Sequence, residues 1–164
     1  EVETLDLSQA LINLRTEIKF CKQCYNLSDG ELCNVCTSPS KDETIVCIVK
    51  DFQDVLAIEN TGQYNGHYHV LGGLISPVDG IGPSDVRIPE LLSRVSNSSI
   101  KEAIIALSST LEGDTTEYYI AKKLREQRVV VSTLSKGIAV GGELEYADEI
   151  TLARSIRNRV NLEE

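Results

Sequence analysis

The sequence predicts an α/β protein with a mainly parallel, four-stranded sheet. A small four-cysteine module precedes the sheet, and a C-terminal helical segment follows it. Three observations predict this arrangement. Short apolar runs alternate with helical patterns from residue 44 onward, which is typical of a parallel sheet. The first run, residues 45–49, is continuously apolar and rich in β-branched side chains, as expected of a strand that is buried on both faces. Ahead of it, four cysteines stand in two CxxC pairs, a spacing that indicates a metal site.

Composition and charge place the chain among globular proteins. Its 164 residues, 41% hydrophobic and 25% charged, suffice for one ordinary domain with a small appendage. No apolar run is long enough to span a bilayer. The net charge of −9 opposes strong nucleic-acid binding by these residues alone, because phosphate contacts need concentrated Lys and Arg. Since no apolar leader follows Glu1, we expect a cytoplasmic protein. The absence of Met suggests that an N-terminal part has been removed.

Residues 5–20 are predicted to form an amphipathic helix. The apolar stripe comprises Leu7, Leu11, Leu14 and Ile18, and the opposite face carries Asn13, Arg15 and Glu17. Asp6 and Gln9 stand three residues apart and would form an N-terminal capping box. Because the helix leads directly into Cys21, we expect its apolar stripe to pack on the cysteine module or on a partner chain.

The cysteine module is predicted to hold one structural Zn²⁺ per chain. The four expected ligands are Cys21, Cys24, Cys33 and Cys36. In a CxxC knuckle the chain turns between the two thiolates, so both can reach one ion at about 2.3 Å. The turn Ser28-Asp29-Gly30 lies in the intervening loop and would bring the second pair back onto the first. Four sulfur ligands leave no position for water, which is typical of a structural rather than a catalytic ion.

Two other interpretations of the cysteines are weaker. A pair of disulfides is disfavoured because the chain has five cysteines, an odd number, and no secretory leader. A thioredoxin-like redox site needs one CxxC pair and not two. The fifth cysteine, Cys47, lies within the apolar run 45–49 and is predicted to be a small core residue.

The remaining elements follow in order. After a polar linker at residues 37–42, further strands are predicted at 67–71, 103–107 and 128–133, and helices at 51–61, 89–95, 115–127 and 148–160. Asp51 is expected to cap the first of these helices, and Pro89 to lie in the first turn of the second. The last helix carries an apolar stripe of Ile150, Ala153, Ile156 and Val160 beside Arg154, Arg157 and Arg159.

Two features of the middle of the chain invite functional interpretations. His67 and His69 are two apart on a strand and share a face, but no neighbouring Cys or carboxylate pattern completes a metal site. We therefore predict hydrogen-bonded structural histidines. The Gly- and Pro-rich loop 72–83 lacks the phosphate-loop pattern G-x-x-x-x-G-K-[ST], so tight turns explain its glycines. Because it leaves the carboxyl end of a strand, a role facing DNA or another subunit stays open.

The chain resembles the RecR recombination mediator family, and the resemblance covers essentially the whole sequence. It rests on the four-cysteine knuckle and on the segments DVLAIE (54–59), YHVLGG (68–73), ISPVDGIGP (75–83), TLEGD (110–114) and GGELEYADE (141–149). Each segment is weak alone, but their occurrence together in this order is highly specific. The resemblance implies a Toprim fold for the sheet domain, with Rossmann-like topology.

The resemblance also implies an organisation and a function. The expected parts are a linking helix at 1–18, a zinc finger at 19–40, a Toprim domain at 43–137 and a C-terminal segment at 138–164; the family's helix-hairpin-helix segment is absent. The implied function is non-enzymatic mediation of bacterial DNA repair, loading recombinase on single-stranded DNA with RecO and RecF. Family members form dimers and ring-like tetramers that encircle DNA. The C-terminal segment, with Glu143, Glu145, Tyr146 and Asp148, would be exchanged between subunits.

Enzymes that share the Toprim fold place a Glu at the end of the first strand and a DxD pair after the third. Here those positions are Lys50, Ser108 and Thr110, and only Glu112 and Asp114 keep an acidic character. Two carboxylates and a lysine make a poor magnesium cage, so we do not expect phosphodiester chemistry. The alternatives are a magnesium-dependent Toprim enzyme and a zinc-ribbon scaffold for protein interactions.

Four of these residues are expected to form an acidic remnant that serves as a partner surface: Glu112, Asp114, Lys50 and Asp51. Lys50 would either pair with Glu112 or Asp114, or remain solvated without a partner. Asp51 could partly restore the missing acidic group, although capping the next helix is its expected role.

Overall fold

The computed structural model describes residues 2–138 and 140–161, without the side chains of residues 2, 3, 14 and 15. Its elements are α1 (Val2–Glu17), β1 (Lys19–Phe20), β2 (Leu27–Ser28), α2 (Asn34–Thr37), β3 (Asp42–Val49), α3 (Phe52–Glu59), β4 (Gly66–Val70), α4 (Ile88–Ser96), β5 (Glu102–Ala106), α5 (Leu111–Glu126), β6 (Val130–Thr133), η1 (Leu144–Tyr146) and α6 (Glu149–Arg157). The chain divides into two compact units, Glu1–Thr133 and Leu134–Glu164. The predicted α/β fold class is confirmed.

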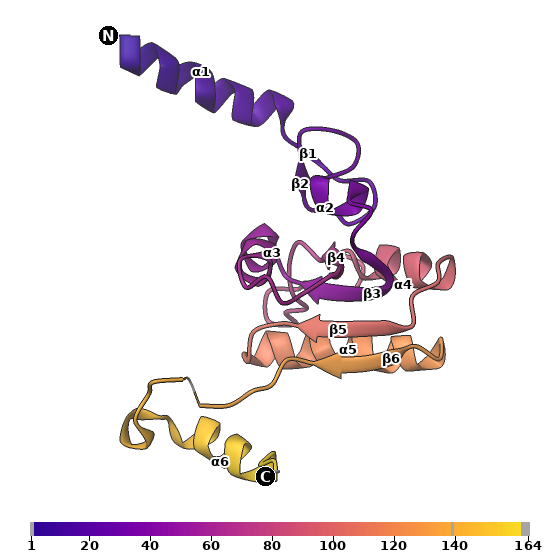
Figure 1. The fold of residues 1–164 in the computed structure, drawn as a ribbon, viewed down its shortest axis with the longest axis vertical. Coiled ribbons are helices and arrows are strands. Elements are labelled where there is room, and N and C mark those ends of the chain that lie inside the picture. The colour runs from indigo at the N-terminus through magenta and orange to yellow at the C-terminus, as the bar shows by residue number, and fades with distance from the viewer. Residues whose placement is uncertain (1, 139, 162–164) are drawn as a thin grey trace. The chain divides into compact units, whose positions relative to one another are not determined.

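The sheet of the first unit has four parallel strands in the order β4-β3-β5-β6 (Figure 1). The side chains of Val46 and Ile48 point to one face, where α4 and α5 cover them. Those of Cys47 and Val49 point to the other face, where α3 packs through Val55. Cys47 is 2% exposed, which confirms its prediction as a core residue.

Local sequence signals explain most helix starts in this unit. The side chain of Asp51 accepts hydrogen bonds from the backbone of α3 in a full capping box, as predicted. Pro89 lies in the first turn of α4, also as predicted. The prediction for α5 was wrong by four residues, because the helix begins at Leu111 and not at Thr115. Thr110 caps it by accepting a hydrogen bond from the backbone N–H of Gly113 at 3.1 Å.

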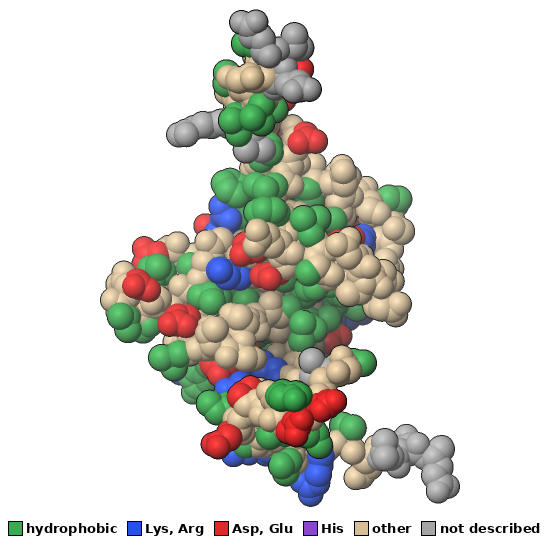
Figure 2. Space-filling model, turned by 90° about the vertical axis from the view of Figure 1, so that its left-hand side faces the viewer, with side chains coloured by type: hydrophobic (Ala, Val, Ile, Leu, Met, Phe, Trp, Pro, Cys, Tyr) green, Lys and Arg blue, Asp and Glu red, His purple; other side chains and the backbone are tan. Residues whose placement is uncertain are grey.

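The N-terminal helix differs from its prediction. α1 begins before Asp6, which therefore cannot be its cap, and ends at Glu17 because Lys19 and Phe20 pair with β2 instead. Leu7 and Leu11 are 62% and 59% exposed, so the predicted stripe does not pack on the cysteine module. Apolar side chains instead gather on the surface of α1 (Figure 2). The side chains of Leu14 and Arg15, and residues 1, 139 and 162–164 of the predicted segments, lie outside the described residues.

The second unit contains η1 and α6. Asp148 caps α6 by accepting from the backbone N–H of Thr151 at 2.9 Å. The helix ends at Arg157, three residues before the predicted end at Val160. Ile150 and Ile156 on its predicted apolar stripe are exposed within this unit. In the described part of the chain, no helix combines the length and the apolar character needed to cross a bilayer.

Candidate metal centre

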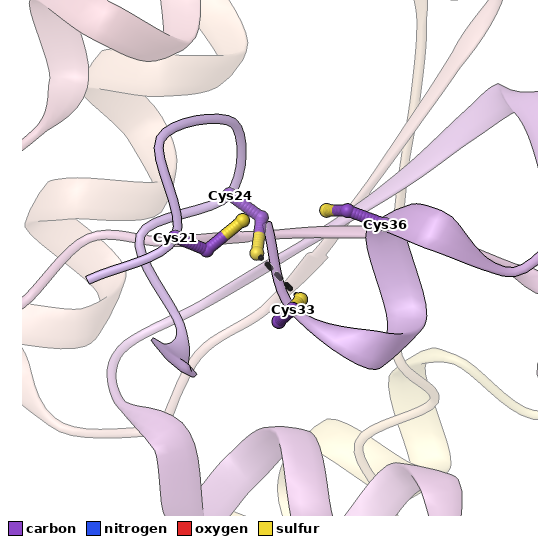
Figure 3. Close-up of side chains that lie close together, drawn as sticks. All are labelled: Cys21, Cys24, Cys33 and Cys36. Atoms are coloured by element: carbon purple, nitrogen blue, oxygen red, sulfur yellow. Dashed lines mark hydrogen bonds between the residues drawn. The ribbon is translucent and has the colours of Figure 1, made fainter. Parts of the chain in front are cut away.

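The four cysteines come from two short segments, a turn and the start of a helix (Figure 3). Cys21 and Cys24 lie in the turn between β1 and β2, while Cys33 stands at the N-cap of α2 and Cys36 within that helix. The first turn is closed by hydrogen bonds from the backbone N–H of Tyr25 to the Cys21 carbonyl and of Cys21 to the Asn26 carbonyl. Three of the thiols are almost fully buried, and Cys36 is half-buried. The turn therefore places all four sulfurs around one interior point.

The distances suit a shared ion. All four sulfur atoms lie within 4.8 Å of one another, and Cys24 Sγ is 3.5 Å from Cys33 Sγ. Two sulfurs on one tetrahedral zinc ion, each at about 2.3 Å, would lie about 3.8 Å apart. A disulfide requires about 2.05 Å, and all five cysteines are free. The cluster thus fits a four-thiolate metal site without large rearrangement.

The thiols of the metal-free cluster differ in how readily they lose their protons. Hydrogen bonds from Cys24 and Cys36 lower the pKa of Cys33 to about 2. The same hydrogen bonds raise the pKa of the thiols that donate them. The hydrogen bond to Cys33, together with burial, raises the pKa of Cys24 to about 12, and the pKa of Cys36 is also raised. A metal-free cluster therefore keeps protons on some thiols, and metal binding must displace them.

The acidic remnant predicted from the sequence does not form a comparable cage. Lys50 Nζ lies 3.7 Å from Asp51 Oδ2, so the prediction of a solvated Lys50 without a partner is wrong. Both groups are substantially exposed, and such surface pairs contribute little to stability. Glu112 and Asp114 lie in the first turn of α5, where negative charge favours the helix. Within residues 2–138 and 140–161, only the four cysteines gather three or more potential metal ligands.

The predicted residues of the C-terminal segment lie in the second unit and are described only within it. Glu143 stands at the N-cap of η1, which contains Glu145 and Tyr146, and the ring of Tyr146 is exposed. Hydrogen bonds from Thr151 lower the pKa of Asp148, whose carboxylate caps α6. The exposed aromatic ring leaves this segment with contact area to offer another surface.

Sequence reasoning missed the residues that join the cysteine module to the sheet. The guanidinium of Arg87 lies over the rings of Phe20 and Tyr25, at 4.4 and 4.9 Å from their centroids. Arg94 reaches from α4 to backbone carbonyls of both parts. Neither arginine belongs to a recognisable motif, and Arg94 is 71 positions from its partner Gln23. Only the positive φ of Tyr25, +63°, marks the junction as unusual.

The histidine prediction is confirmed for His69. Its Nε2 donates to the Arg87 carbonyl at 2.8 Å, and burial lowers its pKa to about 4. The Nδ1 atoms of both His67 and His69 are buried without a hydrogen-bond partner among the described residues.

Fold and cysteine cluster together define a class of protein, a Toprim domain joined to a four-cysteine finger. Residues 44–135 match the Toprim domain family. Residues 18–38 match the RecR four-cysteine zinc finger domain, and residues 137–160 match the RecR C-terminal family.

Relatives extend this match over nearly the whole chain. The chain is 54% identical over 157 residues to a protein of Flavobacterium johnsoniae, covering 96% of this chain and 76% of that one. It is 56% identical over 150 residues to a protein of Bacteroides thetaiotaomicron, covering 92% and 73%. A protein of Amoebophilus asiaticus is 53% identical over 158 residues, covering 96% and 79%. Each is named Recombination protein RecR, and the chain belongs to the RecR family.

Proposed function

We propose that this protein is a non-enzymatic mediator of recombinational DNA repair that works in the bacterial cytoplasm and carries one structural Zn²⁺. The observation that carries the proposal is the identity of 54% with a protein named Recombination protein RecR, sustained over 96% of the chain. Such continuous similarity includes the finger, the sheet domain and the C-terminal segment together.

Zinc is the metal that the cysteine cluster suits best. Four thiolates from Cys21, Cys24, Cys33 and Cys36 favour a soft or borderline ion in tetrahedral geometry, and they exclude hard oxygen-seeking ions such as Mg²⁺. When bound, the ion supplies a crosslink between two short segments that have little apolar core of their own. The buried residues of this module's apolar cluster are three of the cysteines themselves, Cys21, Cys24 and Cys33.

The sheet domain is proposed to serve assembly instead of catalysis. At its carboxyl edge, where the fold's enzymes hold Mg²⁺, Lys50 places a positive charge and Ser108 and Thr110 offer hydroxyls. The carboxylates of Asp51 and Asp54 accept hydrogen bonds from backbone N–H groups at the start of α3, which ties them to a capping role. Glu112 and Asp114 remain as an acidic surface for a basic partner.

The proposed partners are DNA, RecO and RecF, in an assembly built from several copies of this chain. On the face drawn in Figure 2, coloured Lys and Arg side chains lie in small groups beside Asp and Glu. With a net charge of −9, we expect DNA binding by the isolated chain to be weak and strongly reduced by salt. The exposed groups of the C-terminal segment, including Tyr146, would contact a neighbouring subunit.

The deciding experiment is a reconstituted loading assay. The zinc-loaded protein is added with RecO and RecF to gapped DNA covered by single-strand binding protein, and recombinase filament formation is followed. We expect stimulation that disappears when the protein is omitted, and no DNA cleavage with Mg²⁺ or Mn²⁺. Cleavage that is lost on Glu112→Ala would favour a Toprim enzyme. Absence of both loading and DNA binding at low salt would favour a protein-interaction scaffold.

A further inference from the structure

The strand β4 is unusual for an edge strand. It stands at one end of the sheet order, yet all five of its residues are buried. An uncovered edge strand presents unpaired backbone groups that can template pairing with another chain, so proteins usually cover or interrupt it. The cover on β4 therefore identifies a part of the molecule with a protective role.

The knuckle that contains the first two cysteines provides part of this cover, beside α2 and Arg94. The backbone N–H of Val70 donates to the Cys24 carbonyl at 2.8 Å, so Val70 directs its backbone groups away from β3. Because this orientation alternates along a strand, Tyr68 faces the same open edge. Its carbonyl accepts from Arg94 Nη1 at 2.6 Å, and the same nitrogen lies 3.4 Å from the Gln23 carbonyl. Arg94 thus joins knuckle and strand.

Tyr25 adds a side-chain anchor beside these bonds. Its ring meets the His69 ring edge-on at 5.5 Å and lies under the Arg87 guanidinium at 4.9 Å. The backbone of Tyr25 has φ +63°, a conformation that bulky residues adopt only where the surroundings compensate for it. The ring contacts with the sheet domain provide that compensation. The knuckle is accordingly shaped for docking as well as for ligation.

We propose that the knuckle, residues 21–25, guards the open edge of β4, and that metal binding and edge protection are one coupled equilibrium. This inference rests on the proposed zinc site but goes beyond it. An ion held by Cys21 and Cys24 fixes the turn whose carbonyls and ring cover β4. If metal binding strengthens the contacts between the knuckle and β4, those contacts must strengthen metal binding by the same free energy, because thermodynamic coupling is reciprocal. Arg94 is then a positioning residue for an ion that it never touches.

The first experiment follows amide hydrogen exchange in the full-length, zinc-loaded protein before and after chelation. We expect exchange at the Val70 amide to rise at least tenfold when zinc is removed, while the Ile105 amide in the central strand β5 changes less than twofold. Unchanged protection at Val70 overturns the inference. Equal loss at both amides also overturns it, because the whole sheet would then have opened. Failure to find bound zinc contradicts the proposed zinc site instead.

The second experiment measures zinc affinity by competition with a chromophoric chelator. We expect Arg94→Met to raise the Kd for zinc at least fivefold, and Arg94→Lys to restore part of the loss. Arg125→Met, on the exposed last turn of α5, is the matched control and should stay within twofold of the parent protein. Equal affinity in Arg94→Met and in the parent would overturn the coupling.

Tyr25→Gly provides a test that does not depend on Arg94. Glycine accepts positive φ without strain, so a purely local view predicts a more favourable knuckle and tighter zinc binding. The coupled view predicts the opposite, because the ring contacts with His69 and Arg87 are lost. We expect weaker zinc binding and faster exchange at the Val70 amide. Tighter binding with full protection of Val70 would overturn the inference.

Discussion

Two regions of this molecule correspond in position to metal sites, and they differ in almost every respect. The cysteine cluster presents four identical donors from two short segments, three of them buried and all within 4.8 Å of one another. The carboxyl edge of the sheet keeps the position of a Toprim metal site but presents Lys50, Ser108 and Thr110 there. The carboxyl edge therefore has the position of a metal site without the clustered carboxylates that Mg²⁺ prefers.

Several polar side chains at the carboxyl edge of the sheet cap helices. Asp51 and Thr110 cap α3 and α5, and Asp54 completes the capping box of α3. Carboxylates and hydroxyls that bind helix N–H groups are already partly satisfied, which reduces what they could offer an ion. Hydrogen bonds at this edge therefore stabilise the starts of α3 and α5, whereas the four thiols of the cluster converge on one another.

The largest expected effect comes from removing one ligand of the cysteine cluster. Cys33→Ser removes one of the four ligands, a sulfur 3.5 Å from that of Cys24, and should abolish stoichiometric zinc binding, for which a complete site supplies on the order of 10 kcal/mol. Metal analysis of the purified, dialysed protein measures it. Cys47→Ala, in the sheet core, is the control and should retain one zinc per chain. Retention of one zinc by Cys33→Ser would exclude the four-thiolate site.

The second effect tests the close packing of α5 against the loop that follows β5 at the carboxyl edge of the sheet. A Cβ at Gly113 would overlap the carbonyl oxygen of Ser108, so Gly113→Ala must push α5 away from the end of β5. We expect a loss of about 4 kcal/mol in unfolding free energy, measured by urea denaturation. Gly80→Ala, where φ is +71° but nothing lies within 4 Å, should cost only about 1 kcal/mol. Equal effects would show that α5 can shift freely.

The third effect depends on pH and reports the junction between the cysteine knuckle and the sheet domain. Burial lowers the pKa of His69 from 6.5 to about 4, so the folded protein favours the neutral ring. The resulting stability is fully present above about pH 6.5 and is lost as pH falls toward 4, by about 3 kcal/mol in total. His69→Phe cannot titrate there. Lowering the pH from about 6.5 to 4 should therefore destabilise the parent protein relative to His69→Phe by about 3 kcal/mol, and a difference in unfolding free energy that stays constant over this range would contradict the assignment.

The sequence predicted the sheet and the cysteine cluster because both depend on local patterns. The run at 45–49 and the CxxC spacing each specify their structure within a few residues. The start of α5 was missed because Thr110 is one of several polar residues after β5, and only the close approach of Gly113 to Ser108 selects it. The packing of α1 on the cysteine module was wrong, since the periodicity of Leu7 and Leu11 does not say which surface they meet; packing on a partner chain stays a prediction.

The junction could not be predicted for a different reason. Arg94 and Val70 are separated in the sequence from the knuckle residues they contact, and no spacing rule joins an arginine on α4 to the carbonyl of Gln23. Tyr25 has a positive φ that its residue type disfavours, so local propensity pointed away from the observed turn. Contacts of this kind are tertiary and become visible only in three dimensions.

The smallest expected effect is the response of the carboxyl edge of the sheet to Mg²⁺, before and after acidic residues are introduced there. We expect 10 mM Mg²⁺ to stabilise the parent protein by less than about 0.4 kcal/mol, the value for a Kd above about 10 mM. Lys50→Glu combined with Ser108→Asp returns acidic groups to the ends of β3 and β5, near Asp51 and Glu112. A Kd near 1 mM in that variant would give about 1.4 kcal/mol at the same concentration.

Thermal or urea unfolding with and without Mg²⁺ measures this response. The matched control is Lys101→Glu with Ser99→Asp, an equal charge change at exposed positions before β5, where magnesium should have no specific effect. A response confined to the first variant would mean that the edge keeps a metal-binding geometry and lacks only its ligands. A response of more than about 1 kcal/mol in the parent protein would mean that the site was never lost, and the proposed non-enzymatic role would fail with it.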